Sequence, residues 1–189
     1  MSAKAKRIRL DLALVGRGIA PSRTRARALI LAGKVLVDGV PASGAAQQVA
    51  KDQEVSLREP DIPFVSRGGV KLAGALDGLG VSPEGLLCLD VGASTGGFTD
   101  CLLQRGARRI YAVDVGYGQI AWPLRQDERV VVLERTNARY LTPREVPEPV
   151  ELVTADLSFI SLTKVLPALL SVAAEPCVFL LMVKPQFEL

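Results

Sequence analysis

The sequence predicts an α/β protein in which a doubly wound parallel sheet follows a small α+β domain. Two observations carry this prediction: short, uninterrupted apolar runs recur in the later two thirds of the chain, and stretches of helical character separate them. Strands buried on both faces have such a composition, and the alternation is typical of a parallel sheet covered by helices. The expected strands are residues 86–91, 110–113, 130–133, 152–155 and 178–183, with helices over, for example, 97–105 and 162–174.

The composition excludes several classes of protein. The chain has 189 residues, which suits one domain or a small domain joined to an incomplete larger one. It contains no histidine, which excludes catalytic triads and metal sites built on imidazole. Its cysteines show no paired spacing, and Cys88 and Cys177 lie in apolar runs, where we expect core residues. We therefore expect a cytoplasmic protein without a bound metal. No apolar run is long enough to span a membrane.

Positive charge is concentrated near the N-terminus. Residues 4–34 contain nine lysines and arginines but a single acid, Asp11, whereas the whole chain has a net charge of +3. This asymmetry is typical of a segment that binds a polyanion, although a solvated surface would also show it. Arg23 and Arg27 are four residues apart, so they share one face of a predicted helix.

The first region, residues 6–58, has the pattern of a small α+β domain. We expect one short helix near residues 8–15 and a second that starts after Ser22, a suitable N-cap, and ends at Gly33. Asp38-Gly39 is a strong turn signal. Short strands are expected at residues 35–37, 48–49 and 54–57.

Residues 22–39 of this region resemble the S-four-type RNA-binding domain, which occurs in a ribosomal protein and in RNA-modifying enzymes. The resemblance lies in the arginine-rich helix and in the Gly-Lys-Val-Leu-Val-Asp-Gly run that follows it. It implies that the helix faces RNA phosphates, where guanidinium groups displace counterions without reading sequence. The implied RNA-binding residues are Arg7, Arg9, Arg23, Arg25, Arg27 and Lys34. Two prolines mark residues 59–65 as a linker to a second domain, residues 66–189.

A glycine-rich loop follows the first predicted strand of the second domain. It reads Gly-Ala-Ser-Thr-Gly-Gly and is preceded by an acid, Asp90. Glycines between a strand and a helix let the backbone approach a ligand closely. A carboxylate at this point suits an amine-bearing ligand better than a pyrophosphate. Asp114 ends the second strand, where an acid can hold ribose hydroxyls.

This loop resembles the corresponding motif of class I methyltransferases, which have a Rossmann-like fold, and in particular that of the FtsJ-like ribose 2′-O group. The resemblance implies S-adenosyl-L-methionine as the cofactor. It also implies that Asn137, after the third strand, lies near the adenine. The expected cofactor-binding residues are Asp90, Gly92, Ser94, Gly96, Gly97, Phe98, Asp114 and Asn137.

Three further residues are candidates for catalysis: Lys71, Asp156 and Lys184. The last two follow the fourth and fifth predicted strands, so they should reach the same edge of the sheet. Their motifs, Ser-Arg-Gly-Gly-Val-Lys, Ala-Asp-Leu-Ser-Phe-Ile-Ser and Lys-Pro-Gln-Phe-Glu, resemble the TlyA family, once named haemolysins. That resemblance implies 2′-O-methylation of ribosomal RNA, with cytidine as the target and ribosomal RNA or ribosomal subunits as the partner. It matches the three residues to the first three members of a Lys-Asp-Lys-Glu tetrad and leaves Glu188 outside it.

The residue types fit such a reaction. A ribose hydroxyl must lose its proton as it attacks the methyl group, and a lysine can accept that proton only when it is neutral. A second lysine nearby would help to lower the pKa of the first. We therefore expect Lys184 to act as the base, Lys71 to tune it and Asp156 to orient it, although the division between the two lysines stays open. A salt-bridge network that only steadies the strand ends is the structural alternative.

Other functions are weighed by their motifs. Base-amine methyltransferases carry prolines after the fourth strand, and the run that begins at Asp156 has none. A non-catalytic RNA-binding protein and a membrane-acting cytolysin remain alternatives. Class I methyltransferases usually have seven strands, whereas five can be counted here. We therefore expect that the chain lacks the last hairpin and helix of that fold, binds cofactor weakly and turns over poorly. The oligomeric state is not predicted.

Overall fold

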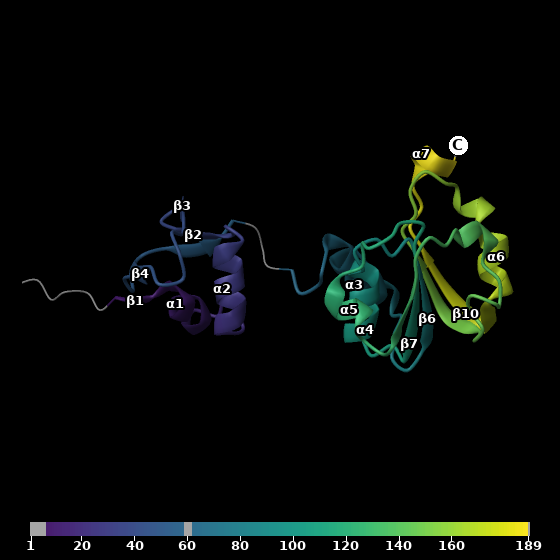
Figure 1. Cartoon of the computed structure of the whole chain (residues 1–189), viewed down its shortest axis with the longest axis horizontal. Coiled ribbons are helices and arrows are strands. Elements are labelled where there is room, and N and C mark those ends of the chain that lie inside the picture. Colours follow the sequence, from purple (N-terminus) through teal and green to yellow (C-terminus); the bar gives the residue numbers. More distant parts are fainter. Residues whose placement is uncertain (1–6, 59–61, 189) are drawn as a thin grey trace, which may run out of the picture. The chain divides into compact units, whose positions relative to one another are not determined.

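A computed structural model describes residues 7–58 and 62–188 (Figure 1). The chain forms two compact units, Met1–Asp61 and Ile62–Leu189, and each is considered by itself. Residues 59–61 of the expected linker and residue 6 of the expected first domain lie outside the described residues.

The first unit consists of two helices and two small antiparallel sheets. β1 pairs with β4, and the second sheet has the order β3-β2-β5. The first helix begins at Leu10 rather than at residue 8, because Ile8 and Arg9 pair with β4. The N-cap of α2 is Ser22, as expected, and its hydroxyl accepts a hydrogen bond from the Arg25 amide at 3.2 Å. The elements are β1 (Ile8–Arg9), α1 (Leu10–Gly16), α2 (Arg23–Leu31), β2 (Val35–Val37), β3 (Val40–Pro41), β4 (Gln48–Val49) and β5 (Val55–Leu57).

The second unit is built on a five-stranded parallel sheet. Its order is β10-β9-β6-β7-β8, and each neighbouring pair is parallel. The strands are β6 (Leu87–Val91), β7 (Arg109–Val113), β8 (Val130–Leu133), β9 (Val150–Ala155) and β10 (Ala173–Leu181). The order changes direction at β6, because the chain runs outward through β7 and β8 and then returns to β9 on the other side of β6. In open α/β sheets, ligands bind at such a switch point, beyond the carboxyl ends of the strands.

Helices cover both faces of this sheet, which confirms the doubly wound architecture (Figure 1). Alternate residues of β6 enter different cores: Cys88 packs with α3, α4 and α5, whereas Leu87 and Leu89 pack with η1, η2 and α6. The helices are α3 (Arg67–Leu79), α4 (Gly97–Gln104), α5 (Trp122–Arg125), η1 (Ala138–Tyr140), η2 (Leu162–Lys164), α6 (Leu166–Ser171) and α7 (Pro185–Glu188).

The last strand differs most from the sequence prediction. β10 begins at Ala173, so the helix expected over residues 162–174 ends earlier, at Ser171. That helix is also divided into two parts, η2 and α6. The pairing of β10 with β9 shifts register between Ala173 and Val178, a stretch that includes Pro176, which has no amide hydrogen to donate. Cys177 was expected in the core, but it is only half-buried, because β10 has a single neighbour in the described sheet.

Contact between α3 and α4 depends on a glycine. A Cβ atom built on Gly97 would lie 2.2 Å from the Ser66 hydroxyl oxygen and 2.9 Å from the Gly69 amide nitrogen. Ser66 is the N-cap of α3, where its hydroxyl accepts from the Gly68 amide at 3.3 Å. The absence of a side chain at Gly97 therefore lets the start of α3, the helix that carries Lys71, lie against α4.

The strand residue Asp90 is almost fully buried beneath the glycine-rich loop. The Thr99 hydroxyl donates a 2.6 Å hydrogen bond to one carboxylate oxygen, and the Thr154 hydroxyl lies 3.4 Å from the other. Burial raises the pKa of Asp90 to about 6, and the bond from Thr99 opposes that shift in part. The carboxylate thus links α4 and β9 to the strand that precedes the loop.

Replacing Gly97 with alanine is expected to destabilise the second unit by about 1–3 kcal/mol. The new methyl group would overlap backbone atoms of α3, which can move only at a cost in free energy. The matched control is Gly74→Ala in α3, where a Cβ meets nothing within 4 Å. That change should be neutral or stabilise the helix by about 0.5–1 kcal/mol. Chemical denaturation of both variants tests the contrast, and equal effects would contradict the packing argument.

Asp90 should make stability depend on pH. Its pKa is higher in the folded state than in the unfolded chain, so the folded state binds the proton more tightly. The resulting stabilisation is complete below about pH 4 and is lost as the pH rises through about 6, with a slope of at most about 1.4 kcal/mol per pH unit. Denaturant unfolding of the unaltered chain and of Asp90→Asn between pH 4.5 and 8 measures it. In Asp90→Asn, the free energy of unfolding should depend less on pH than in the unaltered chain. Identical pH profiles of the two proteins would refute the assignment of this dependence to Asp90.

Candidate active site

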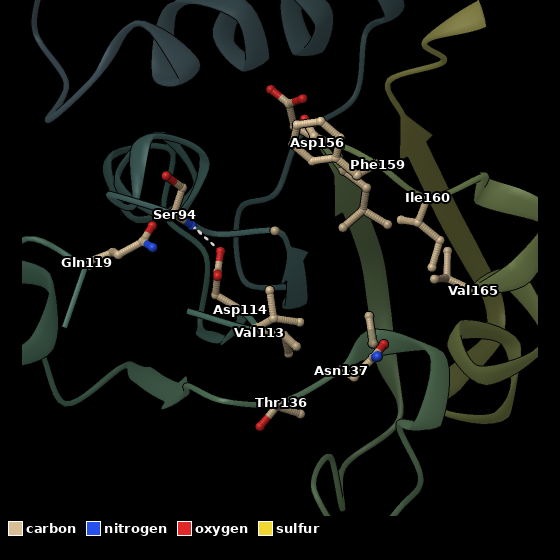
Figure 2. A pocket seen from close by; sticks show the side chains of 15 residues that line it. Ser94, Val113, Asp114, Gln119, Thr136, Asn137, Asp156, Phe159, Ile160 and Val165 are labelled. Atoms are coloured by element: carbon tan, nitrogen blue, oxygen red, sulfur yellow. Dashed lines mark hydrogen bonds between the residues drawn. The ribbon is translucent and has the colours of Figure 1, made fainter. Parts of the chain in front are cut away.

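A cavity of about 540 Å³ opens at the carboxyl ends of the central strands (Figure 2). Its lining comes mainly from the segments that follow β6, β7, β8 and β9, so the fold gathers residues as far apart in the chain as Gly92 and Val165. The polar side chains in this lining include Ser94, Asp114, Gln119, Thr136, Asn137 and Asp156.

The glycine-rich loop forms one wall of the cavity. Gly92 and Gly96 have φ values of +83° and +93°, which side chains rarely permit. A Cβ on Gly92 would also lie 3.0 Å from the carbonyl oxygen of Asp156, and one on Gly96 would lie 2.3 Å from Leu124. The loop therefore packs closely against its neighbours, and the backbone of its first half faces the cavity.

Asp114 fixes this loop and faces the same cavity. One carboxylate oxygen accepts from the Ser94 amide at 2.7 Å, drawn as the dashed line in Figure 2, and the other accepts from the Gly116 amide at 2.7 Å. Asn137 lines the same cavity and starts η1 by accepting from the Arg139 amide at 3.0 Å. Both residues expected to hold the cofactor nucleoside therefore lie in one cavity.

The other expected cofactor residues are distributed around it. Gly97 and Phe98 line a neighbouring cavity of about 290 Å³, which shares Gly92, Ser94 and Asp156 with the first. Asp90 and Gly96 line neither. Asp90 lies beneath the loop with 1% of its surface exposed, so its carboxylate faces neither cavity.

The structure brings the three candidate catalytic side chains together. Lys184 Nζ lies 2.5 Å from one oxygen of Asp156, and Lys71 Nζ lies 3.6 Å from the other. Lys184 Nζ also donates a hydrogen bond at 3.0 Å to the Ser158 hydroxyl. The Lys184 side chain is 21% exposed and that of Lys71 is 56% exposed. Asp156 also lines both cavities, so the ion cluster borders the space where two ligands could meet.

The sequence prediction missed several contributors to the site. Phe159 has a φ of +65° and is 91% exposed, and its ring lies 5.3 Å from that of Phe187. Glu188 accepts from the Ser161 hydroxyl at 2.6 Å and from the Leu162 amide at 2.9 Å, which ties α7 to the loop after β9. Gln119 lines the first cavity. Phe159 and Glu188 lie in motifs that the sequence analysis quoted, but their contacts join distant segments, and Gln119 gave no signal.

In the first unit, three of the expected RNA-binding arginines surround one acid. Arg9, Arg23 and Arg27 each donate to the carboxylate of Asp11. Arg7 and Lys34 are exposed, as is Arg25 on α2.

Across residues 7–58 and 62–188, no group of three or more acids and cysteines is placed to hold a metal ion, and no helix is long and apolar enough to cross a membrane.

Known proteins with similar sequences agree with these expectations. The FtsJ-like methyltransferase family matches residues 64–189, and the S4 domain matches residues 8–55. The 16S/23S rRNA (cytidine-2′-O)-methyltransferase TlyA of Mycobacterium tuberculosis is 54% identical over 185 residues, which cover 97% of this chain and 69% of that protein. A protein named Hemolysin A from Brachyspira hyodysenteriae is 40% identical over 185 residues, which cover 96% of this chain and 75% of that protein.

A solved structure gives the same result at the level of the fold. The chain of a hemolysin-named protein from Streptococcus thermophilus matches with a TM-score of 0.69 at 38% identity, over 99% of this chain and 69% of that one. The S-four-type domain, the Rossmann-like methyltransferase domain and the family resemblance expected from the sequence are thus confirmed. The chain belongs to the TlyA family of FtsJ-like methyltransferases and carries an S4 domain ahead of its methyltransferase domain.

Proposed function

We propose that this chain transfers a methyl group from S-adenosyl-L-methionine to ribose 2′-hydroxyls of ribosomal RNA, with cytidine as the target nucleotide. The observation that carries the proposal is the contact of Asp156 with Lys71 and Lys184 at the border of two adjoining cavities. The activity named for the 54% identical relative from Mycobacterium tuberculosis supports the same reaction. Such a reaction would take place in the cytoplasm, where ribosomal subunits are.

The first cavity has the donors and acceptors that this cofactor needs. Asp114 lies at the end of β7, where a carboxylate can accept from ribose hydroxyls, and Asn137 offers an amide to the adenine. Gly92 and Ser94 line this cavity, so the backbone of the loop could contact the amino-acid end of the cofactor. When bound, the cofactor supplies an electrophilic methyl group on a sulfonium.

The ion cluster would handle the proton of the ribose hydroxyl. Asp156 holds two ammonium groups on opposite oxygens, so both lysines are oriented before substrate arrives. Lys184 is the less exposed of the two and is also held by Ser158, so in its neutral form it would accept the hydroxyl proton at Nζ. Lys71 contacts the other oxygen of Asp156, so the acid holds both lysines at the border of the two cavities. This intact cluster favours a catalytic function over a non-catalytic RNA-binding one.

An exposed aromatic ring beside the cluster would receive the target base. Phe159 comes three residues after Asp156, and its ring packs on Phe187, which comes three residues after Lys184. RNA bases that are lifted out of a helix commonly stack on aromatic side chains. Stacking on Phe159 would therefore hold the nucleotide while its sugar reaches Lys184. The arginines of the S4 domain would hold more distant phosphates of the same RNA.

Replacing Lys184 with alanine tests the role of the base. We expect methyl transfer from labelled S-adenosyl-L-methionine to unmodified ribosomal subunits to fall by about a hundredfold to ten-thousandfold, because the hydroxyl proton loses its acceptor. Cofactor affinity by calorimetry should change little. Lys164→Ala, which removes an exposed lysine from η2, is the control and should keep its turnover. Unchanged turnover in Lys184→Ala would refute the assignment, and mapping of the modified position would test the 2′-hydroxyl itself.

Replacing Phe159 with alanine tests the stacking surface. The ring is 91% exposed, so its removal should leave the unfolding midpoint almost unchanged. Methyl transfer at limiting ribosomal subunits should fall about tenfold or more, since stacking of one base contributes about 1–3 kcal/mol. Phe159→Tyr keeps an aromatic face and should retain most of the activity. Equal losses in the alanine and tyrosine variants would argue against stacking.

A further inference from the structure

A fully buried acid lies within the basic surface of the S4 domain. Asp11 is the single acid among residues 4–34, and its side chain is 0% exposed. It lies in the first turn of α1, the helix whose apolar residues Leu10 and Leu14 fill the core of this unit. A carboxylate here reduces the positive charge of the segment, so its presence needs a reason other than attraction of a polyanion.

Hydrogen bonds from three arginines account for the burial of Asp11. Arg9 binds both carboxylate oxygens, at 3.0 and 3.1 Å. Arg23 and Arg27 donate to one of these oxygens at 3.1 and 3.2 Å, and the Leu12 amide donates to the other at 3.1 Å. These arginines come from β1 and from two successive turns of α2, so the carboxylate joins separate elements.

The arginines themselves remain partly in solvent. Their side chains are 39%, 50% and 56% exposed for Arg9, Arg23 and Arg27 respectively. A guanidinium group has five N–H donors, so contact with one carboxylate leaves most of them available. The bonds from Arg9, followed by those from Arg23 and Arg27, hold the pKa of Asp11 far below its ordinary range, and burial opposes that shift only in part. The acid therefore stays charged at every pH at which RNA would bind.

We propose that Asp11 is a positioning residue for RNA recognition, which fixes the guanidinium groups of Arg9, Arg23 and Arg27 as one preorganised array. The inference rests on the RNA-binding function proposed above for the S4 domain. Without the acid, three like charges on flexible side chains repel one another, and each must be immobilised when RNA binds. With it, their spacing is set beforehand, and the remaining N–H donors can meet neighbouring phosphate oxygens.

The proposal predicts the opposite sign from simple electrostatics. Asp11→Asn makes the chain more positive by one charge, which by itself should tighten binding to a polyanion and steepen its salt dependence. If Asp11 positions the arginines, the same change should weaken binding about tenfold. Three arginine side chains would then have to lose their conformational freedom when the complex forms. Asp52→Asn is the charge-matched control, since it removes an exposed acid from a turn of the same unit. It should leave affinity unchanged or raise it slightly.

The experiment measures the affinity of the 189-residue chain and both variants for unmodified ribosomal subunits over a range of salt concentrations. Circular dichroism and thermal unfolding verify that each variant is folded. Weaker binding by folded Asp11→Asn, with no loss in Asp52→Asn, supports the inference. Equal or tighter binding by folded Asp11→Asn overturns it. Failure of the unaltered chain to bind the subunits would instead contradict the RNA-binding function on which the inference rests.

A second measurement covers the case in which Asp11→Asn does not fold. In the unaltered chain, nitrogen relaxation of the arginine Nε–H groups should show Arg9 and Arg27 to be more rigid than Arg7, which is exposed near the N-terminus. These Nε–H groups donate to Asp11, so they should keep their order when ribosomal RNA is added. Guanidinium groups of Arg9 and Arg27 as mobile as that of Arg7 in the free chain would overturn the proposal.

Discussion

Hydrogen bonding between β6 and its two neighbours sets where the candidate active site lies. Val91 pairs with Val113 on one side and with Ala155 on the other, so Asp114 and Asp156 are the next residues beyond the sheet. The glycine-rich loop starts between them, at the point where the strand order changes direction. A shift of one residue in either pairing would turn these side chains to the opposite face of the sheet. The cavity and the cluster of Lys71, Asp156 and Lys184 therefore both depend on the register of β6 with its two neighbours.

Asp156 links that register to the rest of the site. It contacts Lys71 from α3, whose approach to the sheet needs the bare backbone of Gly97, and Lys184 from the segment after β10. Glu188 then ties α7 back to the loop after β9. The acid is therefore both a part of the expected chemistry and the point at which three separate segments meet. Loss of the α3 contact or of the contact after β10 would move a lysine away from Asp156.

The two units use buried carboxylates in contrasting ways. Asp90 is surrounded by hydroxyl groups, so burial dominates and raises its pKa to about 6. Asp11 is surrounded by guanidinium groups, so the hydrogen bonds from Arg9, Arg23 and Arg27 dominate and lower its pKa. The first acid shapes a loop beside a cavity, and the second orders a cationic surface. Burial alone predicts neither behaviour, because the partners of the carboxylate decide its charge.

Local patterns in the sequence determined the alternation of strands and helices, the Ser22 cap, the glycine-rich loop and the motifs that resemble its family. These features depend on backbone conformation and hydrophobic periodicity over a few residues. Tertiary structure decided the early start of β10, the partial exposure of Cys177, the burial of Asp90 beneath the loop and the arginines around Asp11. Each of these follows from contacts between segments far apart in the chain, and the free energy of such contacts depends on distances and burial that no local pattern records.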